Sequence, residues 1–243
     1  EPLGTVPNFL AMGEPELDRF LSHLNYTLRS ISKRNFFITK EMREDFGPSG
    51  IDGVYPVLLY FAAITGHQVL DSGYVALDGG GGVVQSGAES ADGIWLRLRH
   101  TTPIPNAPPE QNLYYFKTDL SNDGFKGGSK FHQFLSARNN SIAYLKAASF
   151  LMHQDGFTNI RNFLVGNAQV ILQDASGIPA DFLGLYYDLT LYGNYVGPID
   201  MFSEYDQPWL HEAYRAGGAR PLPFGTGYRM RDQDSIQIFG VRK

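Results

Sequence analysis

The sequence predicts an α/β fold, with a mixed, largely parallel sheet, flanking helices in three layers and an N-terminal helical appendage. In the second half of the chain, apolar strand-like runs alternate with short segments of helical period, which is typical of βαβ units. The 243 residues suit one large domain, or a core domain with an appendage. A Gly-Pro-Ser-Gly break at residues 47–50 favours the second organisation. We therefore expect an appendage over residues 1–50 and an α/β core over residues 51–243.

An amphipathic helix is predicted to begin after Gly13. Glu14, Pro15 and Glu16 suit a first helical turn. The backbone N–H that proline lacks would have no partner within the helix there, and acidic side chains complement the helix dipole. The apolar residues that follow recur at spacings of three and four: Leu17, Phe20, Leu21, Leu24, Leu28 and Ile31. We interpret this stripe as a face packed on the core, and a partner-binding helix is the alternative.

Three elements are expected between residues 54 and 100. The apolar run at residues 54–66 is too short to cross a bilayer and is predicted to be a helix ending at Gly66. Residues 67–77 and 94–100 are predicted strands. The glycine-rich segment 78–93 between them is predicted to be a flexible hairpin tip or loop. Four consecutive glycines could cradle a phosphate, but the rest of the P-loop pattern is missing.

The second half of the chain supplies the predicted parallel strands. They cover residues 112–122, 141–149 and 168–176, with helical segments between them. Right-handed crossovers would place their carboxyl ends on one edge of the sheet. Residues 186–196 are predicted to form an antiparallel strand, and residues 235–243 a last strand. Between these two, Asp206 suits the N-cap of a helix.

The stretch ILQDASGIP, residues 171–179, marks where a site would lie. Its apolar run stops at Gln173 and turns at Gly177, so it reads either as a strand tip with a reactive carboxylate or as a strand ending in a polar turn. Ligands of open α/β sheets bind beyond the carboxyl ends of the strands. The three predicted strand ends would bring together Asp119, Asn122, Ser149, His153, Asp155, Asp174 and Ser176.

Ser149, His153 and Asp174 could form a catalytic Ser–His–Asp set. Ser149 lacks the Gly-x-Ser-x-Gly elbow, however, and the chain order differs from that of the hydrolases. Asp119, Asn122 and Ser176 are candidates for binding a ligand without catalysis. The alternative is structural: the carboxylates and hydroxyls cap turns or helices, and His153 is a satisfied edge residue. Whether the protein is an enzyme therefore stays open.

No metal site or cofactor is predicted. The chain has no cysteine, and its six histidines show no His-x-x-x-His, His-Glu-x-x-His or His-x-His pair. A mixed site of Asp119, His153 and Asp174 is conceivable. Residues 119–124, DLSNDG, superficially look like a calcium loop but fail the EF-hand pattern.

Charge and composition limit the partners. The formal net charge is −5 and no long basic run occurs, so nucleic-acid binding is not expected. No transmembrane segment is expected either. Aromatic residues make up 14% of the chain, which fits a ring-rich core or a surface for sugars or a protein partner. A carbohydrate binder could use Tyr186, Tyr187 and Tyr195.

Several stretches resemble a family of uncharacterised, exported proteins known chiefly from bacteria. They lie within residues 113–228: LYYFKTDLSNDG, YLKAASFLMH, IRNFLVGNAQVILQDASGIP, LYGNYVGPI and LPFGTGY. The resemblance implies export and carries over no functional residue. The starting sequence EPLGTVPNF would suit a processed N-terminus, and two glycosylation sequons permit a secretory route.

The expected function is that of a non-catalytic binding module or an accessory subunit of a larger assembly. Its location would be secreted, periplasmic or envelope-associated. A protein partner, a small molecule and a glycan are all possible ligands. A hydrolase and a carbohydrate-binding protein are the alternatives.

Overall fold

A computed structural model describes residues 3–34, 53–102, 108–138, 141–146, 148–225 and 235–243. The chain separates into two compact units, Glu1–Thr118 and Asp119–Lys243, and each unit is described by itself. The predicted boundary between residues 50 and 51, with its Gly-Pro-Ser-Gly break, lies outside the described residues. Within the described ranges, no helix combines the length and apolarity needed to cross a membrane.

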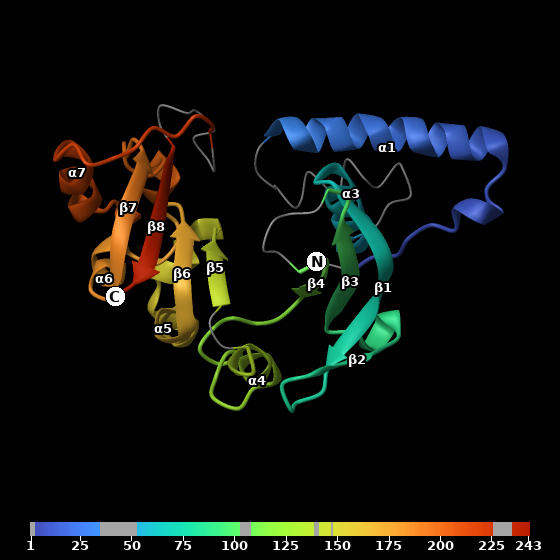
Figure 1. Cartoon of the computed structure of the whole chain (residues 1–243), viewed down its shortest axis with the longest axis horizontal. Helices are drawn as coiled ribbons and strands as arrows, with labels where there is room; N and C mark the ends of the chain where they lie inside the picture. The colour runs from blue at the N-terminus through green and yellow to red at the C-terminus, as the bar shows by residue number, and fades with distance from the viewer. Residues whose placement is uncertain (1–2, 35–52, 103–107, 139–140, 147, 226–234) are drawn as a thin grey trace. The chain divides into compact units, whose positions relative to one another are not determined.

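The first unit contains two long helices and a four-stranded antiparallel sheet of order β2-β1-β3-β4 (Figure 1). Both predicted helices are confirmed. The elements are the short 3₁₀ turn η1 (Phe9–Ala11), α1 (Glu14–Arg34), α3 (Val54–Ile64), β1 (His67–Leu77), β2 (Val83–Gln85), η3 (Ala88–Ser90), β3 (Gly93–His100) and β4 (Glu110–Phe116).

Helix α3 packs against this sheet because its apolar side chains meet those of β3. Tyr55 and Ala62 of α3 lie in one buried cluster with Ile94, Leu96 and Leu98. A second cluster joins α1 to α3 and contains buried Phe20 and Val57, with Met12, Leu24, Tyr60 and Phe61 around them. Phe20 and Leu24 of the predicted α1 stripe therefore pack within the first unit, whereas Leu21 is 46% exposed.

The second unit contains a four-stranded mixed sheet of order β5-β6-β8-β7 (Figure 1). Strands β5 and β6 are parallel, whereas β8 is antiparallel to both of its neighbours. The elements are α4 (Lys130–Ser136), β5 (Ser141–Leu145), η4 (Ala148–His153), η5 (Asp155–Phe157), α5 (Thr158–Asn167), β6 (Ala168–Gln173), α6 (Ala180–Gly184), β7 (Tyr187–Gly193), η6 (Asp200–Tyr205), α7 (Pro208–Arg215) and β8 (Ile236–Arg242).

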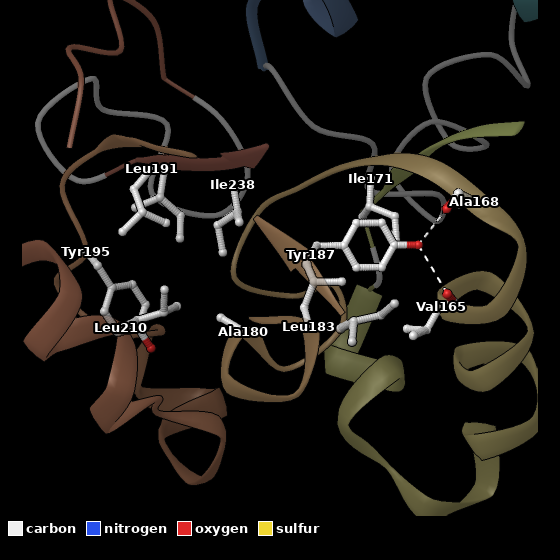
Figure 2. Packing of buried hydrophobic residues seen from close by; sticks show 12 residues of the cluster. Val165, Ala168, Ile171, Ala180, Leu183, Tyr187, Leu191, Tyr195, Leu210 and Ile238 are labelled. Carbon is white, nitrogen blue, oxygen red and sulfur yellow. Dashed lines mark hydrogen bonds between the residues drawn. The ribbon is translucent and has the colours of Figure 1, made fainter. Parts of the chain in front are cut away.

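Helices α5, α6 and α7 each contribute to the main core of the second unit. Val165, Leu183 and Leu210 pack against strand residues that include Ile171, Tyr187 and Ile238 (Figure 2). The Tyr187 hydroxyl donates to the carbonyls of Ala168 and Val165, at 2.7 and 3.2 Å, as Figure 2 shows. The only polar atom of this buried ring is thereby satisfied, as a buried hydroxyl requires.

The prediction of a largely parallel, three-layer sheet is wrong. The first sheet is entirely antiparallel, and β5 with β6 is the single parallel pair among the described strands. The run predicted as the first parallel strand, residues 112–122, instead supplies β4, which pairs antiparallel with β3. Alternation of strands and helices along the chain does not fix pairing, because the chain can reverse direction at each loop.

Two smaller expectations also change. The strand predicted over residues 141–149 ends at Leu145, and Ser149 lies in the 3₁₀ segment η4. The N-cap of α7 is Gln207, not Asp206, and its side chain makes no capping hydrogen bond to the helix. Pro208 lies in the first turn of α7.

Candidate functional site

The turn that follows β6 is held by a buried glutamine. Gln173 is fully buried, and its side-chain amide donates to the Ile178 carbonyl at 2.6 Å while its oxygen accepts from the Ile178 N–H at 2.9 Å. Gly177 is required next to the Gln173 side chain, because a Cβ at this position would lie 2.5 Å from the Gln173 side-chain oxygen. The side chain of the last residue of β6 therefore closes the turn that follows this strand.

Asp174 is the carboxylate that the sequence placed at this strand end, and it is engaged inside the protein. Its Oδ2 lies 2.5 Å from the Lys146 Nζ, and its Oδ1 accepts from the N–H of Ser176 at 2.9 Å and from the Ser176 hydroxyl. Lys146 follows β5 as Asp174 follows β6, and these neighbouring strands are parallel. The carboxyl edge of the parallel pair thus carries an ion pair, with Asp174 only 8% exposed.

A second glutamine anchors the same turn from the start of α7. The Gln207 side chain accepts from the Ala180 N–H at 2.9 Å and donates to the Ala175 carbonyl at 3.0 Å. Its backbone N–H donates to the Tyr195 hydroxyl, which donates to Asp206 at 3.1 Å. Burial, the largest effect, raises the pKa of Tyr195. Tyr195 is therefore a neutral structural link.

The His153 ring also forms a hydrogen bond with the backbone of this turn. Its Nε2 lies 3.2 Å from the Ala175 carbonyl oxygen, so this nitrogen carries the proton and donates. The ring makes edge contacts with Phe150 and Tyr205, which stack on each other at 5.2 Å. Burial lowers the pKa of His153 below its usual range, and the bond to Ala175 raises it by less.

The depressed pKa of His153 predicts a pH-dependent stability. Folded His153 binds its proton less tightly than unfolded His153, whose pKa is near 6.5. The unfolded state then binds more protons between the two values, so the contribution of His153 to the free energy of unfolding is fully present above its unfolded pKa and falls as the pH drops toward the folded value. We expect wild type to lose more stability between pH 7.5 and 5.5 than His153→Gln does, as measured by urea unfolding. An identical pH dependence in both proteins would contradict this assignment. The exposed His23→Gln serves as the control.

Ser149 occupies a strained and accessible position. Ser149 and Phe150 both adopt left-handed backbone conformations, with φ of 54° and 52°, which are costly for residues other than glycine. The Ser149 carbonyl accepts from the Gln154 side chain at 3.2 Å, and this amide also donates to the Tyr205 hydroxyl at 3.2 Å. Ser149 is exposed, whereas Phe150 is buried.

The structure brings Ser149, His153 and Asp174 into one region without linking them. The His153 ring bonds to the carbonyl of Ala175 and not to a carboxylate. Both Asp174 oxygens bond elsewhere, to Lys146 and Ser176. No hydrogen bond joins any two of the three predicted residues within the described ranges. The relay that a Ser–His–Asp mechanism needs is therefore absent from this arrangement.

Asp119 and Asn122 make their hydrogen bonds to residues outside the turn that follows β6. Asn122 fixes the start of α5, since its side chain donates to the Asp155 carbonyl at 2.8 Å and accepts from the Asn159 N–H at 2.9 Å. Asp119 closes a local turn by accepting from the Ser121 N–H at 2.8 Å. That backbone bond is the main reason why the pKa of Asp119 is lowered. Both residues have structural partners here.

Two of the three tyrosines considered for sugar binding are inside the protein. Tyr187 is 1% exposed and Tyr195 is 6% exposed, so neither ring can stack on a sugar. Tyr186 is exposed and packs edge-on against Phe182. Carbohydrate binding stays a prediction, without the support of these two rings.

The glycine-rich loop after β1 holds a carboxylate from its own chain. The Oδ1 of Asp78 accepts from the N–H groups of Gly80 and Gly82, at 2.7 and 2.9 Å. A Cβ on Gly82 would lie 2.5 Å from the other carboxylate oxygen, so the loop closes tightly around Asp78. The backbone N–H groups that could have bound a phosphate bind the Asp78 carboxylate instead.

Reasoning from the sequence missed Lys146, Gln173 and Gln207. Lys146 could have been found, because residues 141–149 and 168–176 were both expected in one parallel sheet with neighbouring ends. Gln173 and Gln207 gave no such signal, since a glutamine that bonds to backbone groups looks like any polar residue at the end of an element.

One face of the second sheet lies away from the main core. The side chains of β5 and β6 alternate, so Ala143 and Ile171 point into the core while Ile142, Tyr144, Val170 and Leu172 point away from it. Phe239 and Val241 of β8 belong to the same outward set by register. We call these six side chains the open sheet face. Ile142 and Tyr144 are its most exposed members, at 75% and 59%.

Comparisons with models of protein families, with curated proteins and with solved structures find no match for this chain.

Proposed function

We propose that the chain is a non-catalytic, exported binding protein that works as a subunit of a larger assembly, and that β5 with the open sheet face forms the assembly surface. The observation that carries the proposal is the exposed apolar edge strand β5. Support for export comes from the sequence resemblance alone. The internal bonding of Asp174 and His153 supports binding over catalysis.

Strand β5 lacks the usual protection of a sheet edge. It pairs with β6 on one side only among the described strands. Its sequence, SIAYL, contains neither a charge nor a proline. Natural edge strands are commonly blunted by such residues, because free N–H and C=O groups recruit further strands. An unprotected apolar edge is therefore expected to be paired in the working protein.

The occupant we propose is β5 of a second copy. An antiparallel pair centred on Ala143 would place Ile142 of each copy opposite Tyr144 of the other, on the same face of the sheet. Aromatic and β-branched residues form favourable cross-strand pairs. The contact is self-complementary, as a two-fold dimer requires, and it would join the two open sheet faces into one surface.

Replacing Tyr144 with lysine tests this surface. Wild type is expected to shift from monomer to dimer between about 1 and 100 µM in sedimentation experiments, since the strand contact is small and its affinity moderate. Tyr144→Lys is expected to stay monomeric over that range, because the charge would be buried in the pair. Met201→Lys is the matched control, since Met201 is also highly exposed, at 78%, but does not belong to the open sheet face.

Two results would overturn the proposed dimer. One is a wild-type protein that stays monomeric at the highest concentration. The other is a loss of self-association in Met201→Lys as large as that in Tyr144→Lys.

A hydrolase is the second candidate, favoured only by the strained, exposed backbone at Ser149. Strain of this kind accumulates at functional sites. The deciding measurement is hydrolysis of a panel of ester and amide substrates by wild type and Ser149→Ala. Equal rates for the two proteins would remove this candidate.

A further inference from the structure

Two histidines face each other at one end of the first sheet. His67 begins β1 and His100 ends β3, and the two are directly paired in the antiparallel register. Their ring centroids lie 4.9 Å apart, with the ring planes at 83°. Hydrogen bonds beside the histidines join the two strands at this end of the sheet. The Gly66 carbonyl accepts from both the N–H and the hydroxyl of Thr101, at 2.8 and 2.9 Å.

The Nδ1 atom of His67 carries a proton. It lies 3.1 Å from the Thr65 hydroxyl oxygen, and that hydroxyl already donates to the Phe61 carbonyl at 2.7 Å. Since the hydroxyl hydrogen is used, the imidazole must donate in the contact between them. The other nitrogen of His67, Nε2, therefore presents a lone pair.

His100 can adopt the same tautomer. Its Nδ1 contacts the carbonyl oxygen of Thr102, which can only accept. The Thr102 N–H also lies 3.1 Å from this nitrogen. With a proton on Nδ1 this nitrogen donates to the Thr102 carbonyl, and without one it accepts from the Thr102 N–H. In the first of these two forms Nε2 of His100 presents a lone pair as well, and neither Nε2 has a hydrogen-bond partner among the described residues.

The charges around the pair favour a cation. Helix α3 ends at Ile64, directly before the pair, and the carbonyls at a helix C-terminus carry partial negative charge. The basic residues of β3, Arg97 and Arg99, alternate with Leu98 and His100 and so lie on the opposite face. There they form ion pairs with Glu110, at 3.9 and 2.5 Å.

We propose that His67 and His100 bind one divalent late transition-metal ion through their Nε2 atoms, with Cu²⁺ preferred over Zn²⁺ and Ni²⁺. Imidazole nitrogens suit these ions, and Cu²⁺ heads the affinity order. A second nitrogen that donates to an oxygen acceptor is the usual arrangement of a metal-binding histidine. Directly opposed side chains in an antiparallel pair have Cβ atoms about 5 Å apart, so modest ring rotations bring both nitrogens to one ion.

The site has two protein ligands, and water would complete the coordination. No group of three or more histidine, aspartate or glutamate side chains suited to a metal occurs in the described part of the chain. A two-histidine site leaves several coordination positions open for exchange. The ion is therefore expected to bind reversibly and not to be needed for folding.

Titration of the tag-free, 243-residue chain with CuCl₂ at pH 7.5 tests the proposal. Calorimetry is expected to give one site per chain, and electron paramagnetic resonance to show two coordinated nitrogens. His67→Gln and His100→Gln are each expected to weaken Cu²⁺ binding at least about tenfold. His23→Gln, which changes an exposed histidine on α1, should leave the affinity unchanged.

A further variant separates the site from general effects on folding. Thr65→Val removes the acceptor of the His67 Nδ1 proton, so Cu²⁺ affinity should fall while the two-nitrogen spectrum is kept. Circular dichroism checks that each variant remains folded. Wild type binding Cu²⁺ no more tightly than the His67→Gln/His100→Gln double variant would overturn the proposal. A loss in His23→Gln as large as that in His67→Gln would do the same.

Discussion

Replacing Gln173 with leucine is expected to lower the free energy of unfolding of the second unit by about 3 to 5 kcal/mol. The substitution removes both hydrogen bonds of the Gln173 side chain and leaves the N–H and C=O of Ile178 unpaired. Ile178 is 0% exposed, so water cannot replace the lost partners. Each unsatisfied buried polar group costs about 1–3 kcal/mol.

Tryptophan fluorescence can report this loss for the second unit alone. The chain has two tryptophans, Trp95 in the first unit and Trp209 in the second. Urea unfolding is therefore best measured in a Trp95→Phe background, where Trp209 is the only reporter. Gln169→Leu, an exposed change on the same strand, is the control and should cost much less. If Gln173→Leu lowers the free energy of unfolding by less than about 1 kcal/mol, the turn does not depend on the two hydrogen bonds of the Gln173 side chain.

Replacing Gly193 with alanine is expected to cost about 3 kcal/mol or more. Gly193 ends β7 with φ of +87°, and a Cβ there would lie 1.9 Å from the backbone oxygen of Ser235. The left-handed conformation alone costs about 1–2 kcal/mol for alanine. The close approach adds more, because the Ser235 carbonyl belongs to the chain entering β8 and accepts from the Asn194 N–H.

Gly217→Ala is the matched control for this prediction. Gly217 has nearly the same φ, +83°, but a Cβ there would meet nothing within 4 Å. The difference between the two variants therefore measures the steric contact at the junction of β7 and β8, again by urea unfolding with Trp209 as reporter. Equal losses in Gly193→Ala and Gly217→Ala would mean that Ser235 moves aside at little cost.

The predictions from sequence succeeded where local signals decide the structure. The apolar stripe and acidic first turn of α1, and the bounds of α3 and β1, follow from spacing and turn residues. They failed in the pairing of strands. Residues 112–122 read as a strand, correctly in part, but nothing in their pattern shows whether they pair with β3 or with β5.

The candidate site divides in the same way. The sequence placed Asp174 at a strand end beside a tight turn, which the structure confirms. It could not show that Lys146 and Ser176 engage the carboxylate, or that His153 bonds to the Ala175 carbonyl. Those contacts join residues up to 28 positions apart, and they depend on distances that only the folded chain sets.

The sequence by itself therefore determined most helices, most strand positions and the turn after residue 173, because these depend on periodicity and on residues close in the chain. Only the tertiary structure decided the two sheets, the single parallel pair, the engaged carboxylate and the opposed histidines. The physical reason is that strand pairing and side-chain bonding are contacts between distant segments. Many pairings satisfy the same local pattern, and the packing of the whole unit selects among them.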